Sequence, residues 1–259
     1  MWSRRPRLQS QLQIPSHMTN VNFMRHLSPV ERTKYSMSRP AFDIVIPLPD
    51  DAAVTSDIHL RAMEENLLTH AQFPNPQAWE FFREWLTTNT REHIQHSNKG
   101  VLIARDSATG EIASFIKWLE YGSGGEVALP PPTTTVEDEW PEFCGRLILD
   151  EYTNIAADAR KRVLGEKGYF HVTFLCTDPK WGGRGAASAL LRELVNMAED
   201  AGKAIILEGV MPAVPLYKRL GFEVRQELKM MLPPRGSTER TELYLEQTMV
   251  WAPPSWDNV

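Results

Sequence analysis

The chain has little cysteine and no long hydrophobic run. Its 259 residues include only Cys144 and Cys176, which are far apart and lack metal-ligand spacing. This excludes a disulfide framework, gives no sign of zinc or another metal, and fits a reducing compartment. No apolar run approaches the roughly 18 residues that span a bilayer, so we expect a protein that is not integral to a membrane and has no membrane partner.

Charge is unevenly distributed. Residues 1–40 hold seven basic residues against one acid, Glu31, so they carry +6, and residues 41–259 must carry −11 to give the net −5 of the chain. We expect a basic, disordered arm over 1–40. This composition is typical of mitochondrial transit peptides and equally of disordered tails, so mitochondrial targeting is the alternative to a cytoplasmic location. The arm has no recognisable nucleic-acid motif, and no nucleic-acid partner is expected.

The most informative stretch is residues 178–191, DPKWGGRGAASALL, which places three glycines and two alanines around Arg184. It follows an aromatic and β-branched segment, residues 168–177, and precedes an amphipathic segment whose apolar positions recur at helical spacing. A second apolar run, Ala204–Val210, comes next. The order strand, small-residue loop, helix, strand predicts a loop whose free N–H groups bind an anion, and therefore a ligand that carries phosphate.

Two common phosphate motifs do not fit this loop. A nucleoside-triphosphate P-loop needs Lys followed by Ser or Thr at the helix start, where this chain has Gly185, Ala186 and Ala187. A dinucleotide fingerprint needs a third glycine where Ser188 stands, and the loop lies late in the chain.

The remaining segments predict a mixed sheet. A strand over residues 42–48 precedes a helix from Asp50 toward His70 and a second helix after Pro76. Strands over residues 100–105 and 112–121 follow, joined by a turn at 106–110. Residues 122–168 form an insertion: a Gly/Pro/Thr-rich loop, the acids Glu137 to Glu139, and a helix over 146–164. We expect this insertion to wall the acceptor pocket and its acids to attract a cationic amine; a solvated surface loop is the alternative.

Residues 178–191 resemble the acetyl-CoA loop of the GCN5-related N-acetyltransferase (GNAT) superfamily, with its signature [Q/R]-x-x-G-x-[G/A]. Gly185 and Ala187 match the last two fixed places, while Gly182 stands where Gln or Arg is usual. A second block, EGVMPAVPLYKRLGFEV, is similar to the family's L-Y-x-x-x-G-F motif. The resemblance is close over residues 169–224. It implies an α/β (α+β mixed sheet) fold, the GNAT acyl-CoA N-acyltransferase fold, with a central mixed sheet of about six or seven strands flanked by helices, formed by residues 41–259 as one domain.

The resemblance also implies residue roles. Main-chain groups of Leu175, Cys176 and Thr177 would contact the pantetheine and the thioester, beside a β-bulge that separates this strand from the next. Tyr217 would be the general acid for the leaving thiolate. The pyrophosphate would bind the amides of Gly182, Gly183, Arg184, Gly185, Ala186, Ala187 and Ser188.

The general base stays open between two residues. His171 corresponds to one of a pair of histidines in some arylalkylamine-acetylating relatives, and Thr173 occupies the place of the other. Glu208, at the end of the following strand, is the second candidate, and water is a third. Strand alternation places His171, Thr173 and Leu175 on one face and Cys176 on the other, so we expect no nucleophilic cysteine.

The sequence therefore predicts an acetyl-CoA-dependent N-acetyltransferase that acetylates a small-molecule amine by direct attack in a ternary complex, as a monomer or homodimer. A protein N-terminal or lysine acetyltransferase is the alternative within the enzyme class. The alternative outside it is a GNAT domain that binds acyl-CoA without turnover.

Overall fold

The computed structural model describes residues 41–122, 140–254 and 256. The basic arm and the loop over 123–139, including the acids Glu137 to Glu139, lie outside the described residues. Within the described ranges, no helix combines the length and the apolarity needed to cross a membrane.

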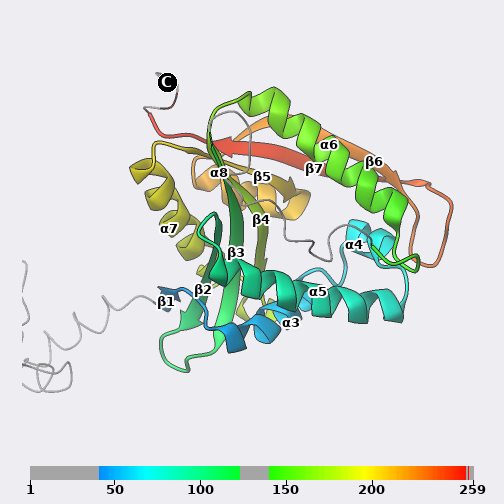
Figure 1. The fold of residues 1–259 in the computed structure, drawn as a ribbon, viewed down its shortest axis with the longest axis horizontal. Helices are drawn as coiled ribbons and strands as arrows, with labels where there is room; N and C mark the ends of the chain where they lie inside the picture. The colour runs from blue at the N-terminus through cyan, green and yellow to red at the C-terminus, as the bar shows by residue number, and fades with distance from the viewer. Residues whose placement is uncertain (1–40, 123–139, 255, 257–259) are drawn as a thin grey trace, which may run out of the picture. The chain divides into compact units, whose positions relative to one another are not determined.

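The body is built on one mixed sheet of seven strands (Figure 1). In chain order the strands are β1 (Phe42–Val45), β2 (Lys99–Asp106), β3 (Ile112–Tyr121), β4 (Tyr169–Thr177), β5 (Ala204–Val210), β6 (Glu223–Leu232) and β7 (Glu242–Trp251). Their spatial order is β1-β2-β3-β4-β5-β7-β6, in which only β4 and β5 are parallel neighbours. The predicted mixed sheet flanked by helices is confirmed.

Helices cover both faces of this sheet. Four contribute to one face: α3 (Ala52–Ala62), α4 (Leu67–Gln72), α5 (Pro76–Gln95) and α6 (Arg146–Leu164). The other face is covered by α7 (Ala186–Asp200) and α8 (Val214–Arg219). Short 3₁₀ turns occur at Pro49–Asp51, Pro179–Trp181 and Met211–Ala213. The largest apolar cluster lies under α7, where the fully buried Leu190, Leu191 and Leu194 contact residues of β3, β4 and β5.

Two predicted boundaries are wrong. The helix expected from Asp50 toward His70 is two helices, because α3 ends at Ala62 and Asn66 starts α4 by accepting a hydrogen bond from Thr69 N–H at 2.8 Å. The first strand ends at Val45, two residues before Pro47. The predicted strand pair β2 and β3 and the helix α6 are confirmed.

The edge strand β1 is only four residues long, and prolines follow it. Both features block the addition of another strand to this edge.

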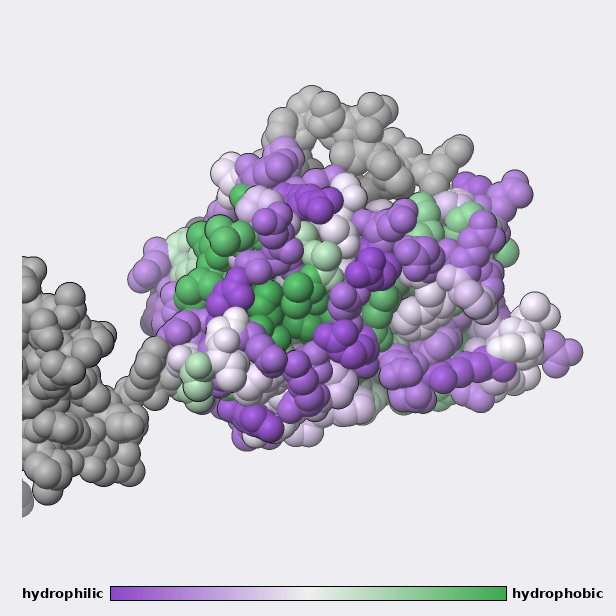
Figure 2. Space-filling model, turned by 90° about the horizontal axis from the view of Figure 1, so that it is seen from below, coloured by the Kyte–Doolittle hydropathy of each residue, from purple (hydrophilic) through white to green (hydrophobic). Residues whose placement is uncertain are grey.

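Just beyond β1, Ile46 is 69% exposed and Leu48 is 67% exposed. Apolar surface gathers between hydrophilic regions in the view from below (Figure 2).

A β-bulge in β4 lies where β4 separates from its neighbour β5. Lys117 of β3 is opposite Phe174 and the next residue, Trp118, is opposite Val172, so Thr173 is an extra residue without a partner. The parallel pairing of β4 with β5 runs only as far as Val172 and Leu207. Beyond that point β4 stays paired with β3 and β5 with β7, so a gap opens between β4 and β5. The bulge and the separation expected there are confirmed.

The close approach of α4 and the start of α6 yields a stability prediction. Gly145 precedes α6 and donates its N–H to the Gln72 carbonyl at 2.7 Å. A Cβ at this position would lie 2.2 Å from the carbonyl oxygen of Ala71. We expect Gly145→Ala to lower the free energy of unfolding in urea by about 3 kcal/mol, because backbone atoms must move apart.

Gly110→Ala is the matched control for this variant. Gly110 has φ of +76° and open space around the place of a Cβ. Its alanine variant therefore carries left-handed strain of about 1 kcal/mol without a clash. Equal losses in the two variants would contradict tight contact between α4 and α6.

Candidate active site

A cavity of about 350 Å³ occupies the gap between β4 and β5. Its lining includes the three residues predicted to be catalytic, His171, Glu208 and Tyr217. They come from β4, from β5 and from α8, which follows β5 closely in the sequence. The gap thus joins groups from the two faces of the sheet in one space.

His171 and Glu208 form a hydrogen-bonded pair. His171 Nε2 lies 2.9 Å from Glu208 Oε2, and the Arg160 guanidinium of α6 donates to Glu208 Oε1 at 3.1 Å. All three side chains are largely buried. Two acceptors at 2.9 Å would repel each other, so we assign the imidazole proton to Nε2, which donates it to Glu208.

This pairing separates the roles of the two candidate bases. Burial alone would raise the pKa of Glu208, but the adjacent His171 and Arg160 outweigh it and hold that pKa below its ordinary value. Both carboxylate oxygens of Glu208 are already hydrogen bonded. By contrast, the buried Nδ1 of His171 has no hydrogen-bond partner within the part of the chain that is described. In the neutral ring this nitrogen is an acceptor for a proton.

Tyr217 reaches the cavity from the opposite face. It is buried in α8, and its ring lies against the backbone of Gly209, where an added Cβ would come within 3.0 Å of the ring. Burial, followed by smaller contributions from Cys176 and Glu246, raises the pKa of Tyr217. The phenol therefore keeps its proton at neutral pH.

The loop before α7 has the geometry of an anion site. Gly183 and Gly185 have φ of +73° and +89°, values that favour glycine, and a Cβ on either would contact nothing within 4 Å. The Ala189 N–H donates to the Gly185 carbonyl, so the N–H groups of the three preceding residues, Ala186 to Ser188, have no acceptor within the helix. Gly182 and Arg184 are also exposed here. Open space and free donors at a helix start suit a phosphate group.

The end of β4 presents main-chain groups toward the gap at two of the three predicted residues. The Cys176 carbonyl accepts a hydrogen bond from Ser114 Oγ at 2.7 Å, and it therefore faces β3. Because main-chain groups of successive residues in a strand point to opposite edges, those of Leu175 and Thr177 face β5. The carbonyl of Cys176 is not available to a ligand in the gap.

The bulge overturns the predicted alternation of side chains. Leu175 packs with the cluster under α7, whereas Cys176 packs with Ile58 of α3. The extra residue Thr173 reverses the alternation, so Cys176 lies on the same face as His171 and not opposite to it. Burial raises the pKa of the Cys176 thiol to about 12, which keeps it protonated and unreactive.

Sequence reasoning missed Glu246 of β7, which also lines the cavity. Tyr152 and Tyr244 donate hydroxyl hydrogen bonds to its two oxygens at 2.9 and 2.6 Å. Burial raises the pKa of Glu246 to about 7, although the two hydroxyls act in the opposite direction. The available signal was an acid on the inward face of an apolar strand, beside Tyr244 and Thr248. Arg160 was also missed, although it lies one helical turn after Ala156, on the same face of the predicted helix as Tyr152.

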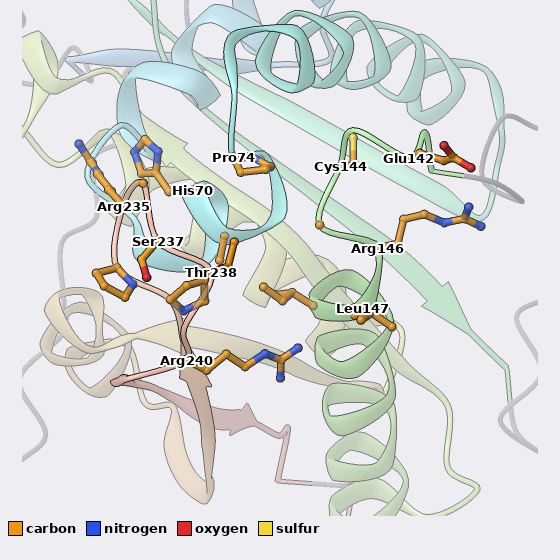
Figure 3. Close-up of a pocket in the computed structure, with 16 residues that line it drawn as sticks. His70, Pro74, Glu142, Cys144, Arg146, Leu147, Arg235, Ser237, Thr238 and Arg240 are labelled. Atoms are coloured by element: carbon orange, nitrogen blue, oxygen red, sulfur yellow. The ribbon is translucent and has the colours of Figure 1, made fainter.

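A larger cavity, about 690 Å³, lies between α4, the start of α6 and the loop joining β6 to β7 (Figure 3). It contains none of the predicted site residues. Its Arg235 bonds to Glu65 and its Arg240 to Glu151, so these cations already have partners. Across the described ranges, no three side chains of His, Cys, Asp or Glu gather in a way that could hold a metal ion.

Comparison with known proteins finds a family match over part of the chain. Residues 142–230 match the family model of the acetyltransferase (GNAT) domain. This match covers 89 of the 259 residues and supports the GNAT superfamily. A curated relative, the L-amino acid N-acetyltransferase AaaT of Escherichia coli (strain K12), is 36% identical over 55 residues, which are 19% of this chain and 34% of that protein. The match thus spans about a third of the length of this relative.

Solved structures show the GNAT fold over most of the body. A mosquito arylalkylamine N-acetyltransferase like 5b superposes with a TM-score of 0.54 at 18% identity, covering 82% of this chain and 99% of the other. The polyamine N-acetyltransferase of Drosophila melanogaster gives the same values. An agmatine N-acetyltransferase mutant has a TM-score of 0.53 at 17% identity and covers 82% of this chain and 100% of its own.

The environment of Glu246 predicts a pH dependence of stability. Its pKa is about 7 in the folded state, against 4.5 for an unperturbed carboxyl. Folding therefore favours the protonated form, and the stability that this form contributes is lost as pH rises from about 4.5 through 7. Relative to Glu246→Gln, the wild type should lose about 3 kcal/mol of unfolding free energy between pH 4.5 and 8. Urea titrations at both pH values measure this, and a constant difference would refute the raised pKa.

Proposed function

We propose that this protein is an acetyl-CoA-dependent N-acetyltransferase that acetylates a small-molecule amine by direct attack in a ternary complex. The observation that carries the proposal is the cavity between β4 and β5, whose lining includes the protonated phenol of Tyr217 and the hydrogen-bonded pair of His171 and Glu208. The family match supports the donor, and the arrangement of proton-transfer groups supports the reaction.

The donor side fits the shape of the loop and the gap. The free N–H groups at the start of α7, beside Gly183 and Gly185, would bind the pyrophosphate of the donor. The outward main chain of Leu175 and Thr177 would hydrogen bond the pantetheine arm along the gap. Gly182 contributes a backbone group at the place where the family usually has a longer side chain.

The proton-transfer groups divide the reaction between them. When bound, acetyl-CoA supplies a thioester whose carbonyl carbon the amine attacks. Nδ1 of His171 takes the proton that the ammonium must lose, and Glu208 holds the ring by accepting from Nε2. A C–N bond forms and the C–S bond breaks, and the Tyr217 hydroxyl gives its proton to the departing sulfur. Glu208 is a positioning residue in this scheme, since Arg160 and His171 keep it ionised.

The names of the fold neighbours favour a small acceptor. They include an agmatine, a polyamine and an arylalkylamine N-acetyltransferase. Protein N-terminal or lysine acetylation is the alternative activity. A thiol-release assay with acetyl-CoA across amines, polyamines, amino acids and peptides separates these two. Saturable acetyl-CoA binding without thiol release from any acceptor would favour a non-catalytic acyl-CoA-binding domain instead.

A charge placed in the loop should test the donor site. Gly185 itself is a poor position, because its φ of +89° strains any side chain. Ala187→Glu adds an anion in the first turn of α7, where the helix dipole favours it and the fold is preserved. We expect calorimetry to show acetyl-CoA affinity about tenfold or more below that of Ala187→Gln, the neutral variant of similar size. Equal affinities for acetyl-CoA in the two variants would contradict binding of the pyrophosphate at this loop.

Loss of either proton-transfer group should reduce turnover. We expect His171→Gln and Tyr217→Phe each to lower kcat by about 100-fold or more while the KM for acetyl-CoA changes little. Steady-state kinetics with the preferred amine, above and below neutral pH, provides the measurement. Exposed His96 supplies the control variant His96→Gln. An unchanged kcat in Tyr217→Phe would show that this tyrosine only packs in the core.

A further inference from the structure

The Glu246 carboxyl group is buried in the cavity and has no cation beside it among the described residues. It is 4% exposed, lines the cavity, and receives hydrogen bonds from the hydroxyls of Tyr152 and Tyr244. Asn66 in turn donates to the Tyr244 hydroxyl at 3.2 Å, which fixes that ring. Within residues 41–122 and 140–254, no Lys, Arg or His forms an ion pair with Glu246.

Glu208, the other carboxylate of the cavity, has a different electrostatic environment. Arg160 balances the negative charge of Glu208, and His171 also binds this carboxylate, so no further cation is required beside it. Each oxygen of Glu246 accepts one hydroxyl and keeps further acceptor capacity. A buried carboxyl group without an opposite charge stays protonated, or ionises when a cationic ligand binds beside it.

We propose that Glu246, held by Tyr152 and Tyr244, is a subsite for a second cationic group of the acceptor. The acceptor is then an amine that carries a further ammonium or guanidinium group. This inference rests on the proposed function and deepens it, because it names the class of amine.

The chemistry of the transfer distinguishes the second charge from the reacting nitrogen. The nitrogen that attacks the thioester must be neutral, since a protonated amine has no lone pair to donate. The reacting nitrogen therefore cannot be the cation that balances Glu246 through turnover. A separate group that stays protonated can do so.

The sheet register sets the separation of the two groups. Glu208 is opposite Thr248 and Val210 is opposite Glu246, so Glu246 lies one strand over and two residues along from Glu208. From the usual strand spacing and rise, their Cα positions are about 8 Å apart. With the reacting nitrogen near the pair of His171 and Glu208, the second cation would lie several bonds away along the acceptor chain.

Binding of a diamine without acetyl-CoA tests the subsite directly. The probe is putrescine, with butylamine as the monoamine of equal carbon number. We expect calorimetry to show that Glu246→Gln weakens putrescine binding about 30-fold or more and butylamine binding far less. Glu242→Gln, on the exposed start of the same strand, should bind both amines as the wild type does. Wild-type affinity of Glu246→Gln for putrescine would overturn the subsite.

Kinetics separates the subsite from the proposed function. In the thiol-release assay, Glu246→Gln should lower kcat/KM for putrescine far more than kcat/KM for butylamine. An equal fall of kcat with both amines would overturn the subsite and assign Glu246 to proton transfer. If the wild type binds putrescine through Glu246 but releases no thiol with any acceptor, the subsite stands and the proposed function fails. Glu246→Gln should also unfold at the wild-type temperature or above, which excludes misfolding as the cause of a loss.

Discussion

The separation of β4 from β5 is the constraint on which the site depends. Four residue pairs join these parallel strands, and then each strand keeps only its antiparallel neighbour. The bulge at Thr173 bends β4 away at the same level. The resulting gap lets Tyr217 from one face of the sheet and His171 from the other line a single cavity. A continuous sheet would have kept them on opposite sides of a layer of backbone.

Inside this gap, environment gives similar groups different roles. Glu208 and Glu246 are both buried carboxylates, yet the first is held ionised by a cation and an imidazole while the second has only tyrosine hydroxyls. Their pKa values accordingly shift in opposite directions. We propose that the paired carboxylate orients a base and that the unpaired one binds a positive ligand.

Burial also explains why a neighbouring cysteine and histidine are not expected to react. Behind β4, Cys176 lies 3.7 Å from Nδ1 of His59, an arrangement that in an open site would suggest a nucleophile. Desolvation is the largest cause of both shifts: it raises the pKa of the thiol to about 12 and lowers that of His59 to about 3, with Lys117 nearby lowering the latter further. Both side chains are neutral at physiological pH, so the pair is part of the core.

The sequence by itself determined the mixed sheet, the helix α6 and the small-residue loop, because periodicity and glycine placement act within one segment. It also singled out His171, Glu208 and Tyr217. Tertiary structure alone decided that His171 and Glu208 are one hydrogen-bonded unit and that Cys176 shares a face with His171, since an inserted residue reverses strand alternation. It also decided that Glu246 lines the same cavity. These facts depend on register between distant strands, which no local pattern encodes.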